Sequence, residues 1–143
     1  MAGRRNKGFR DLLVWQKGMD ALELVHAVSA EFPKHEMFGL TSQIRRAAYS
    51  VVLNISEGYK RRRYPRDFLR QLITAHGSEG EVETAIEIAV RLKYINAASG
   101  RRVWKAYDEI GRMLEGLIKS VERETELQQK PGKKSPQVET AGS

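Results

Sequence analysis

The chain of 143 residues is 41% hydrophobic and 30% charged, which is typical of one soluble domain with a single core. It contains no cysteine, which excludes disulfides, thiolate metal sites and a cysteine nucleophile. Lys and Arg (25 residues) exceed Asp and Glu (18 residues), and the formal charge of +7 favours binding to phosphate backbones or acidic protein surfaces. No apolar stretch approaches the roughly 20 residues of a membrane span, and the basic N-terminus leads into no apolar signal core. We therefore expect a cytoplasmic protein without a membrane partner.

A first helical pattern extends from about Asp11 to Glu31, after a basic N-terminal arm at residues 1–10. Asp11 is expected to cap the start of this helix. Pro33 is expected to stop it, because proline lacks the N–H that the next turn needs. The apolar residues are spaced by threes and fours, as one helix face requires; they are Leu12, Trp15, Met19, Leu22, Val25 and Val28.

Two further patterns follow in the middle of the chain. One extends from about Phe38 to Tyr59, and the other opens with Pro65 and continues to about Lys93. Proline suits a first helical position, where its missing N–H would be unpaired in any case. The predicted faces consist of Leu40, Ile44, Ala47, Val51, Ile55 and Tyr59, and of Phe68, Leu72, Ala75, Val82, Ile86 and Ala89.

The fourth pattern, from about Ser99 to Leu127, has the most regular spacing. Its apolar residues recur at intervals of 4, 3, 4, 3 and 4; they are Val103, Tyr107, Ile110, Leu114, Leu117 and Val121. The connections between the four helices are short, so sequential helices should be antiparallel. We therefore predict an all-α, up-down-up-down four-helix bundle at residues 11–127, followed by a disordered tail at residues 128–143.

A basic cluster at residues 60–70 occupies the turn between the second and third helices and carries six positive charges and one negative charge. Arginine binds phosphate bidentately, and a tyrosine beside it can stack on an unpaired base. The alternative is a solvated loop whose charges pair with helix C-terminal carbonyls and nearby carboxylates. The predicted nucleic-acid-binding residues are Lys60, Arg61, Arg62, Arg63, Tyr64, Arg66 and Arg70.

The third helix carries three acidic residues at successive i, i+4 positions, where like charges repel. A basic neighbour would remove this penalty, either Arg45 or Arg46 of the same chain or an arginine of an adjacent subunit. The alternative is a solvated acidic face. A polar flank on the second helix is also placed for contacts between helices or subunits. The predicted oligomer interface consists of Arg45, Arg46, Asn54, Glu57, Glu79, Glu83 and Glu87.

No catalytic, metal or cofactor site is predicted. Glu23 and His26 have the Glu-x-x-His spacing of di-iron bundles, but such a site needs that motif on two helices. Gly77 and Gly80 lack the setting of a phosphate loop and indicate a kink or a close backbone approach. Four aromatic residues are interpreted as core or interface anchors: Trp15, Phe38, Trp104 and Tyr107.

Four segments occur in an order that resembles the bacterial four helix bundle protein family, whose members are encoded within intervening sequences of large-subunit ribosomal RNA genes. They are residues 13–17 (LVWQK), 38–47 (FGLTSQIRRA), 54–58 (NISEG) and 81–84 (EVET). The resemblance implies a homopentameric ring. It also implies a similarity in fold to the accessory variability proteins of diversity-generating retroelements, which are basic pentamers that bind a reverse transcriptase and its nucleic acid.

The sequence departs from this family in the third helix, where a usually apolar position is Glu79 and the next residue is Gly80. We expect either looser packing there or contact with another subunit. Two hypotheses follow for the function. The first is a non-enzymatic, homo-oligomeric protein that binds RNA or single-stranded DNA; the second is a protein-interaction scaffold that docks a reverse transcriptase.

Overall fold

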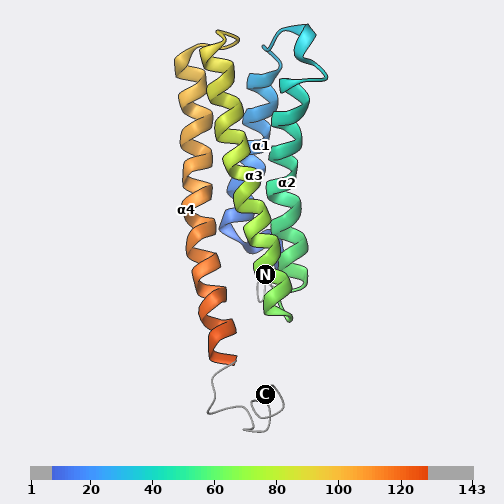
Figure 1. Ribbon diagram of the computed structural model, residues 1–143, viewed down its shortest axis with the longest axis vertical. Helices are drawn as coiled ribbons and strands as arrows, with labels where there is room; N and C mark the ends of the chain where they lie inside the picture. The colour runs from blue at the N-terminus through green and yellow to red at the C-terminus, as the bar shows by residue number, and fades with distance from the viewer. Residues whose placement is uncertain (1–7, 129–143) are drawn as a thin grey trace, which may run out of the picture.

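The computed structural model describes residues 8–128 and contains four α-helices that lie side by side (Figure 1). No strand occurs within these residues, so the prediction of an all-α fold with four helices is confirmed. None of the described helices is long and apolar enough to cross a membrane. Most of the predicted arm and tail lies outside the described residues. The elements are η1 (Gly8–Asp11), α1 (Leu13–Ser29), η2 (Lys34–Glu36), α2 (Leu40–Lys60), α3 (Pro65–Arg91) and α4 (Ala97–Gln128), where η denotes a 3-10 helix.

The start of α1 differs from the prediction. Asp11 is the last residue of η1, and the N-cap of α1 is Leu12, whose side chain makes no capping hydrogen bond. The predicted Asp11 cap is therefore wrong, because a 3-10 helix precedes α1 and includes this residue. Pro65 does occupy the first position of α3, as its missing N–H predicts.

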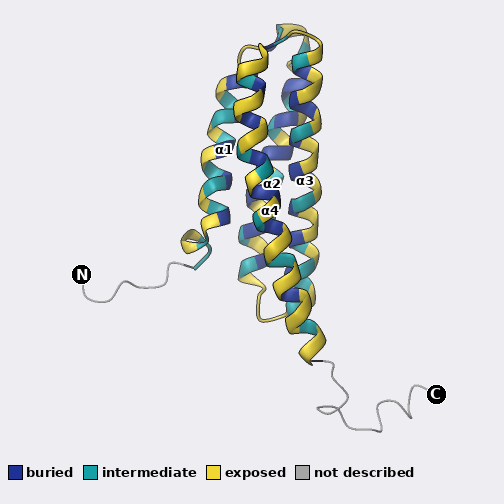
Figure 2. Ribbon diagram, turned by 90° about the vertical axis from the view of Figure 1, so that its left-hand side faces the viewer, coloured by how far each residue is buried: buried dark blue, intermediate teal, exposed yellow. Residues whose placement is uncertain are grey.

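The apolar face of α4 forms one side of the core. Val103, Tyr107, Ile110 and Leu114 are fully buried, and Val121 is nearly so. Figure 2 shows the buried positions of the helices turned toward the interior of the bundle, with exposed positions outside. Burial of each such apolar side chain stabilises the folded state by about 1.5–3 kcal/mol. A helix with apolar residues at this regular spacing is therefore expected to turn them toward the core.

The helix connections lie at two ends of the bundle. The α1–α2 and α3–α4 connections are at the upper end in Figure 1, and the α2–α3 turn is at the lower end. The basic cluster and the first residues of α2 are therefore at opposite ends. This arrangement decides which charged groups can act together.

The C-terminus of α3 is closed by two backbone hydrogen bonds. The amide of Lys93 donates to the Val90 carbonyl at 3.0 Å, and the amide of Tyr94 donates to the Ala89 carbonyl at 2.9 Å. This is the Schellman pattern, which places the residue after the cap in the left-handed region. Lys93 adopts a φ of 64° there, where glycine would be unstrained.

The middle of α3 is helical throughout. Gly77 and Gly80 are exposed, and a Cβ atom added at either position would meet no atom within 4 Å. The predicted close backbone approach is therefore wrong within the described chain. α3 runs unbroken past both glycines.

Candidate nucleic-acid interface at the α2–α3 turn

We use the name basic turn for residues 60–70, from the last residue of α2 into the first two turns of α3. Short backbone hydrogen bonds hold its shape: the Arg61 amide donates to the Gly58 carbonyl at 2.9 Å, and the Tyr64 amide donates to the Arg61 carbonyl at 2.8 Å. Every Lys and Arg side chain of the basic turn is exposed. The turn therefore presents its guanidinium groups to solvent from a fixed backbone.

Gly58 sets the distance between α2 and α3 directly before the turn. A Cβ atom on Gly58 would lie 3.0 Å from the Cβ of Gln71 and 3.2 Å from Cδ1 of Phe68. The two helices approach each other this closely because glycine has no side chain. The close approach brings the polar side chains of both helices into hydrogen-bond distance.

Two arginines of the basic turn form ion pairs on their own helices. Arg61 contacts Glu57 at 3.5 Å, and Arg70 contacts Asp67 at 2.6 Å. Both pairs are exposed, and exposed pairs of this kind are worth about 0–1 kcal/mol. A phosphate group can therefore compete with either carboxylate for the guanidinium.

Arg62 is held by an aromatic ring. Its guanidinium carbon lies 4.0 Å from the centroid of the Tyr59 ring, and its Nη1 donates to the Tyr59 carbonyl at 3.0 Å. Cation–π contact leaves the charge of the guanidinium unneutralised. Arg62 thus remains a cation in a defined position.

The remaining cations of the turn have no partner among residues 8–128. Lys60, Arg63 and Arg66 make no side-chain hydrogen bond and no ion pair to the described chain. Tyr64 lies among them with an exposed side chain. The three free cations and the neighbouring phenol are the groups that can contact a polyanion without displacing an internal partner.

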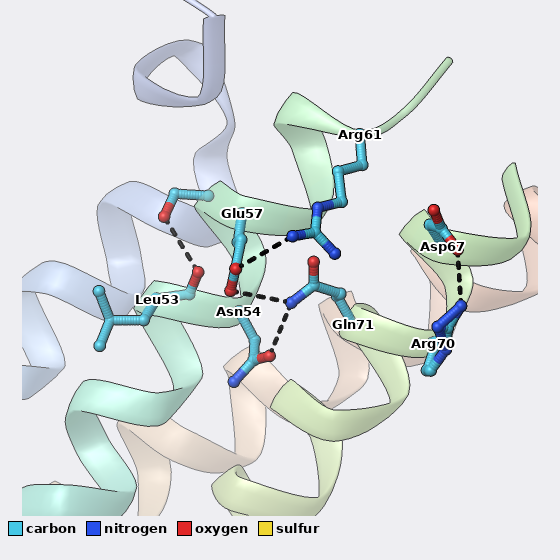
Figure 3. A network of polar contacts seen from close by, with 8 residues as sticks. Leu53, Asn54, Glu57, Arg61, Asp67, Arg70 and Gln71 are labelled. Atoms are coloured by element: carbon cyan, nitrogen blue, oxygen red, sulfur yellow. Dashed lines mark hydrogen bonds and ion pairs between the residues drawn. The ribbon is translucent and has the colours of Figure 1, made fainter. Parts of the chain in front are cut away.

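A hydrogen-bonded network joins the turn to the α2–α3 interface (Figure 3). The Gln71 amide nitrogen donates to Asn54 Oδ1 and to Glu57 Oε1, both at 3.0 Å. Asn54 in turn donates to the Ser50 carbonyl at 2.9 Å. Glu57 therefore holds Arg61 with one oxygen and is held by Gln71 with the other. Asn54 and Glu57 were predicted at a subunit interface, and the structure shows these internal contacts for them.

Arg45 has a structural position at the end of α1. Its Nε donates to Ser29 Oγ at 2.8 Å, and its Nη2 approaches the His26 carbonyl at 3.4 Å. A cation at a helix C-terminus satisfies free carbonyls and the negative end of the helix dipole. The guanidinium of the neighbouring Arg46 is exposed and makes no such bond within residues 8–128.

The acidic residues of α3 do not share one environment. Glu79 is 4% exposed, whereas Glu87 is exposed and pairs with Arg91 at 3.0 Å. Neither Arg45 nor Arg46 pairs with an acidic residue of α3 in the described chain. The first of the two predicted alternatives, an ion pair with Arg45 or Arg46 of the same chain, is therefore not formed within residues 8–128, although Arg46 and Glu81 of α3 line one cavity.

Glu79 faces α4. A Cβ atom on Gly111 would lie 2.5 Å from Glu79 Oε1, so the glycine provides the space that the carboxyl group fills. Burial, a hydrogen bond to Glu83 and nearby acidic charges raise the pKa of Glu79 from 4.5 to about 9. Its Oε2 has no hydrogen-bond partner among the described residues. Glu79 was predicted on a subunit surface, and the structure instead places it inside the protomer.

His26, the histidine of the incomplete di-iron motif, and His76 on α3 contact other side chains. His26 Nε2 lies 2.7 Å from the Tyr49 hydroxyl, and burial lowers the pKa of this imidazole with help from the Arg45 charge. His76 lies 3.8 Å from Glu115. Within residues 8–128, no group of three or more His, Asp or Glu side chains is arranged to hold a metal ion.

The four predicted aromatic anchors differ in burial. Tyr107 is fully buried, Trp15 is half-buried, and Trp104 is 42% exposed. Phe38 is 92% exposed and precedes α2 instead of lying within it. Phe38 was predicted at the start of the second helical pattern and as a core or interface anchor, and no feature of the sequence indicated that its ring would be exposed in the turn before α2.

The comparisons with known proteins agree with the fold. A sequence model of the 23S rRNA-intervening sequence protein family matches residues 10–116. The chain belongs to this family. The match includes the whole of α1, α2 and α3 and most of α4, so the family sequence extends over the basic turn and both neighbouring helices.

A solved structure supports the same assignment. The chain is similar to a protein of unknown function from the S23 ribosomal protein family of Bacteroides thetaiotaomicron VPI-5482. The two share 25% sequence identity with a TM-score of 0.67, and the match covers 75% of this chain and 99% of that chain. No curated protein matches the chain. The family thus establishes the architecture and leaves the activity to be argued from the site.

Proposed function

We propose that this member of the intervening-sequence protein family is a non-enzymatic, cytoplasmic protein that binds RNA or single-stranded DNA through the basic turn. One observation carries the proposal: Lys60, Arg63 and Arg66 are exposed at one end of the bundle and unpaired within residues 8–128. Unpaired cations on a rigid support bind phosphates without first losing an internal ion pair.

The other groups of the basic turn have different roles in this proposal. Arg62, held over Tyr59, contributes a fixed positive charge, and Tyr64 offers a ring on which an unpaired base stacks. Arg61 and Arg70 bind phosphate in competition with Glu57 and Asp67, which already share their charge. Because backbone contacts carry no base information, we expect binding with little sequence preference.

We further propose that the chain is an up-down-up-down bundle that assembles into a homopentameric ring. A surface cavity of about 530 Å³ between the start of α2 and the middle of α3, beside Gly77 and Gly80, supports self-association. Leu40 and Ile88 contribute apolar surface to it, and Glu81 contributes charge. A closed ring would repeat the basic turn, and weak phosphate contacts would then combine through avidity. Native mass spectrometry tests this assembly, and a monomer at micromolar concentration would contradict it.

The cavity beside Gly77 and Gly80 also supports a second candidate function, a scaffold that docks a protein partner such as a reverse transcriptase. A partner side chain can approach the α3 backbone there, since neither glycine carries a Cβ atom. In this version the basic turn contacts nucleic acid held by the partner. A scaffold would bind purified RNA weakly and with the same affinity before and after changes in the basic turn.

A salt series of binding measurements tests the primary proposal. The variant Arg63→Gln/Arg66→Gln removes two unpaired cations of the basic turn. The matched control, Arg101→Gln/Arg102→Gln, removes two exposed arginines from the start of α4 at the opposite end. Both variants change the net charge equally, so a general electrostatic effect would be the same in both.

For a single-stranded ligand, each neutralised phosphate contributes roughly 0.7 to the slope of log affinity against log salt. Loss of two contacts should therefore lower the slope by about 1.4 in the basic-turn variant and leave it unchanged in the control. Identical slopes for the two variants would reject the basic turn as the binding site.

A further inference from the structure

The upper end of the bundle in Figure 1, opposite the basic turn, contains a cavity of about 640 Å³. This volume is in the range of small-ligand sites. The cavity lies where the end of α1, η2 and the start of α2 meet, and we call it the end cavity. The residues that line it include Lys34, Phe38, Thr41, Ser42, Arg45 and Arg46.

The charge of the end cavity is positive. Lys34, Arg45 and Arg46 line it, and no carboxylate does. The acidic residue of η2, Glu36, is engaged elsewhere: it accepts hydrogen bonds from the Leu40 amide and the Tyr94 hydroxyl, both at 2.8 Å. The bond from the Leu40 amide is the main reason that the pKa of Glu36 is lowered. The cavity thus favours an anionic ligand.

Arg45 enters this cavity in a fixed position. Its bonds to Ser29 and to the His26 carbonyl use Nε and Nη2, which leaves Nη1 without a hydrogen bond to residues 8–128. Arg46 is exposed beside it and has no ion-pair partner in the described chain, although Glu81 lies with it around a neighbouring cavity. One guanidinium is therefore prepositioned, and the other is free to move to a ligand.

Polar donors of α2 also face the end cavity. Thr41 is 8% exposed, and its hydroxyl makes no hydrogen bond to any residue of the described chain. The amides of Thr41 and Ser42 belong to the first turn of α2, where helical amides lack an acceptor in their own helix, and they donate to no other backbone carbonyl within residues 8–128. First-turn amides and a hydroxyl next to two guanidinium groups form a donor set suited to phosphate oxygens.

Phe38 supplies an exposed aromatic ring beside these donors. Its side chain is 92% exposed beside the cavity, and its ring contacts no other aromatic ring of residues 8–128. A flat apolar ring next to phosphate donors is the arrangement by which single-stranded nucleic acid is bound, since every base has a face that stacks. An acidic peptide would use the same cations but has no need of an exposed ring.

We infer that the end cavity is a second nucleic-acid contact, which takes one nucleotide unit of a single strand. The phosphodiester lies against Thr41, Ser42 and Arg46, and the base stacks on Phe38. The inference rests on the proposed function for the class of ligand, but it uses no residue of the basic turn. Because α2 has 21 residues and is about 31 Å long, the two contacts are well separated.

The separation allows each contact to be tested alone. The probe is a hexathymidylate, and the Arg63→Gln/Arg66→Gln background removes two cations of the basic turn, so that binding at the end cavity is measured on its own. The probe carries 4-thiothymidine, and mass spectrometry locates the crosslinked peptides. The variants are Phe38→Leu, which keeps an apolar side chain without a ring, and Met37→Leu, a matched control in the same cavity.

We expect crosslinks at the peptide that contains Phe38. In the Arg63→Gln/Arg66→Gln background, Phe38→Leu should weaken hexathymidylate binding about tenfold, as expected for the loss of one stacked base, and Met37→Leu should have no effect. Crosslinks confined to the basic turn would overturn the second contact and leave the proposed function intact. Crosslinks confined to the Phe38 peptide would support the second contact and contradict binding at the basic turn.

The same set of variants tests whether Phe38 instead takes part in self-association. Sedimentation of Phe38→Leu should give the wild-type mass. A lower mass together with unchanged binding of hexathymidylate would assign Phe38 to a subunit contact, and the inference would then be wrong.

Discussion

Replacing Glu79 by glutamine should stabilise the protein at neutral pH. In the folded chain Glu79 is buried against Gly111 and, in its protonated form, donates a hydrogen bond to Glu83, while Asp108 and Glu115 add negative charge nearby. These surroundings raise its pKa from 4.5 to about 9. At pH 7 the folded state therefore keeps a proton that the unfolded state has lost. Glutamine has nearly the same shape, but it has no ionisable proton to retain on folding.

The magnitude follows from the pKa shift. As pH rises, the unfolding free energy falls wherever the folded state binds more protons than the unfolded state. For one group the fall is about 1.4 kcal/mol per pH unit. For Glu79 this loss begins near pH 4.5 and ends near pH 9. The cost at pH 7 is about 3 kcal/mol, which is a large share of the 5–15 kcal/mol that stabilises a typical domain.

Urea denaturation followed by circular dichroism at pH 5, 7 and 9 measures this cost. The gain in unfolding free energy from Glu79→Gln should increase with pH across this range. Glu81→Gln is the matched control, since it removes an exposed carboxylate from the same helix and should change stability by less than about 0.5 kcal/mol at every pH. A gain from Glu79→Gln that does not vary with pH would refute the reasoning.

Three further predictions concern the turns at the two ends of the bundle. Gly58→Ala should lower the unfolding free energy by about 1–3 kcal/mol, because the added methyl group would lie 3.0 Å from the Cβ of Gln71; urea titration measures the loss. Lys93→Gly should raise the melting temperature, since glycine adopts the φ of 64° at the end of α3 without strain and the gain is up to about 1 kcal/mol. Glu57→Gln should increase affinity for single-stranded RNA a few-fold in low salt, as measured by fluorescence titration, because it frees Arg61 from a 3.5 Å ion pair. A lower affinity would show that the pair orients Arg61 for binding, and an unchanged affinity would show that Arg61 does not contact the RNA.

The helices could be predicted from the sequence because burial follows spacing. α4 begins two residues before the predicted Ser99 and ends one residue after the predicted Leu127. Pro65 fixed the start of α3 to the residue. These features depend on local rules, namely the helical period and the missing N–H of proline, which act within a few residues of the chain. The position of the basic cluster between two helices followed from the same rules.

The environments of individual polar residues could not be predicted in this way. Glu79, Glu83 and Glu87 have the spacing of one acidic face, yet only Glu79 is buried, because the partner position on α4 is Gly111. Arg45 lies one residue from Arg46 but binds the end of α1. Such differences depend on which residues of two distant helices meet, and a single sequence does not contain that information.

The network behind the basic turn shows why its cations should not act equally. Gln71 holds Glu57, and Glu57 holds Arg61, so a phosphate that takes Arg61 must also disturb contacts at the α2–α3 interface (Figure 3). Arg63 and Arg66 have no such constraint within the described chain. The first phosphate contacts should therefore form at the free arginines, and Arg61 should follow only when the strand lies close enough to compete with Glu57. This order predicts that changes at Arg63 and Arg66 affect association, whereas a change at Arg61 affects mainly the rate of dissociation.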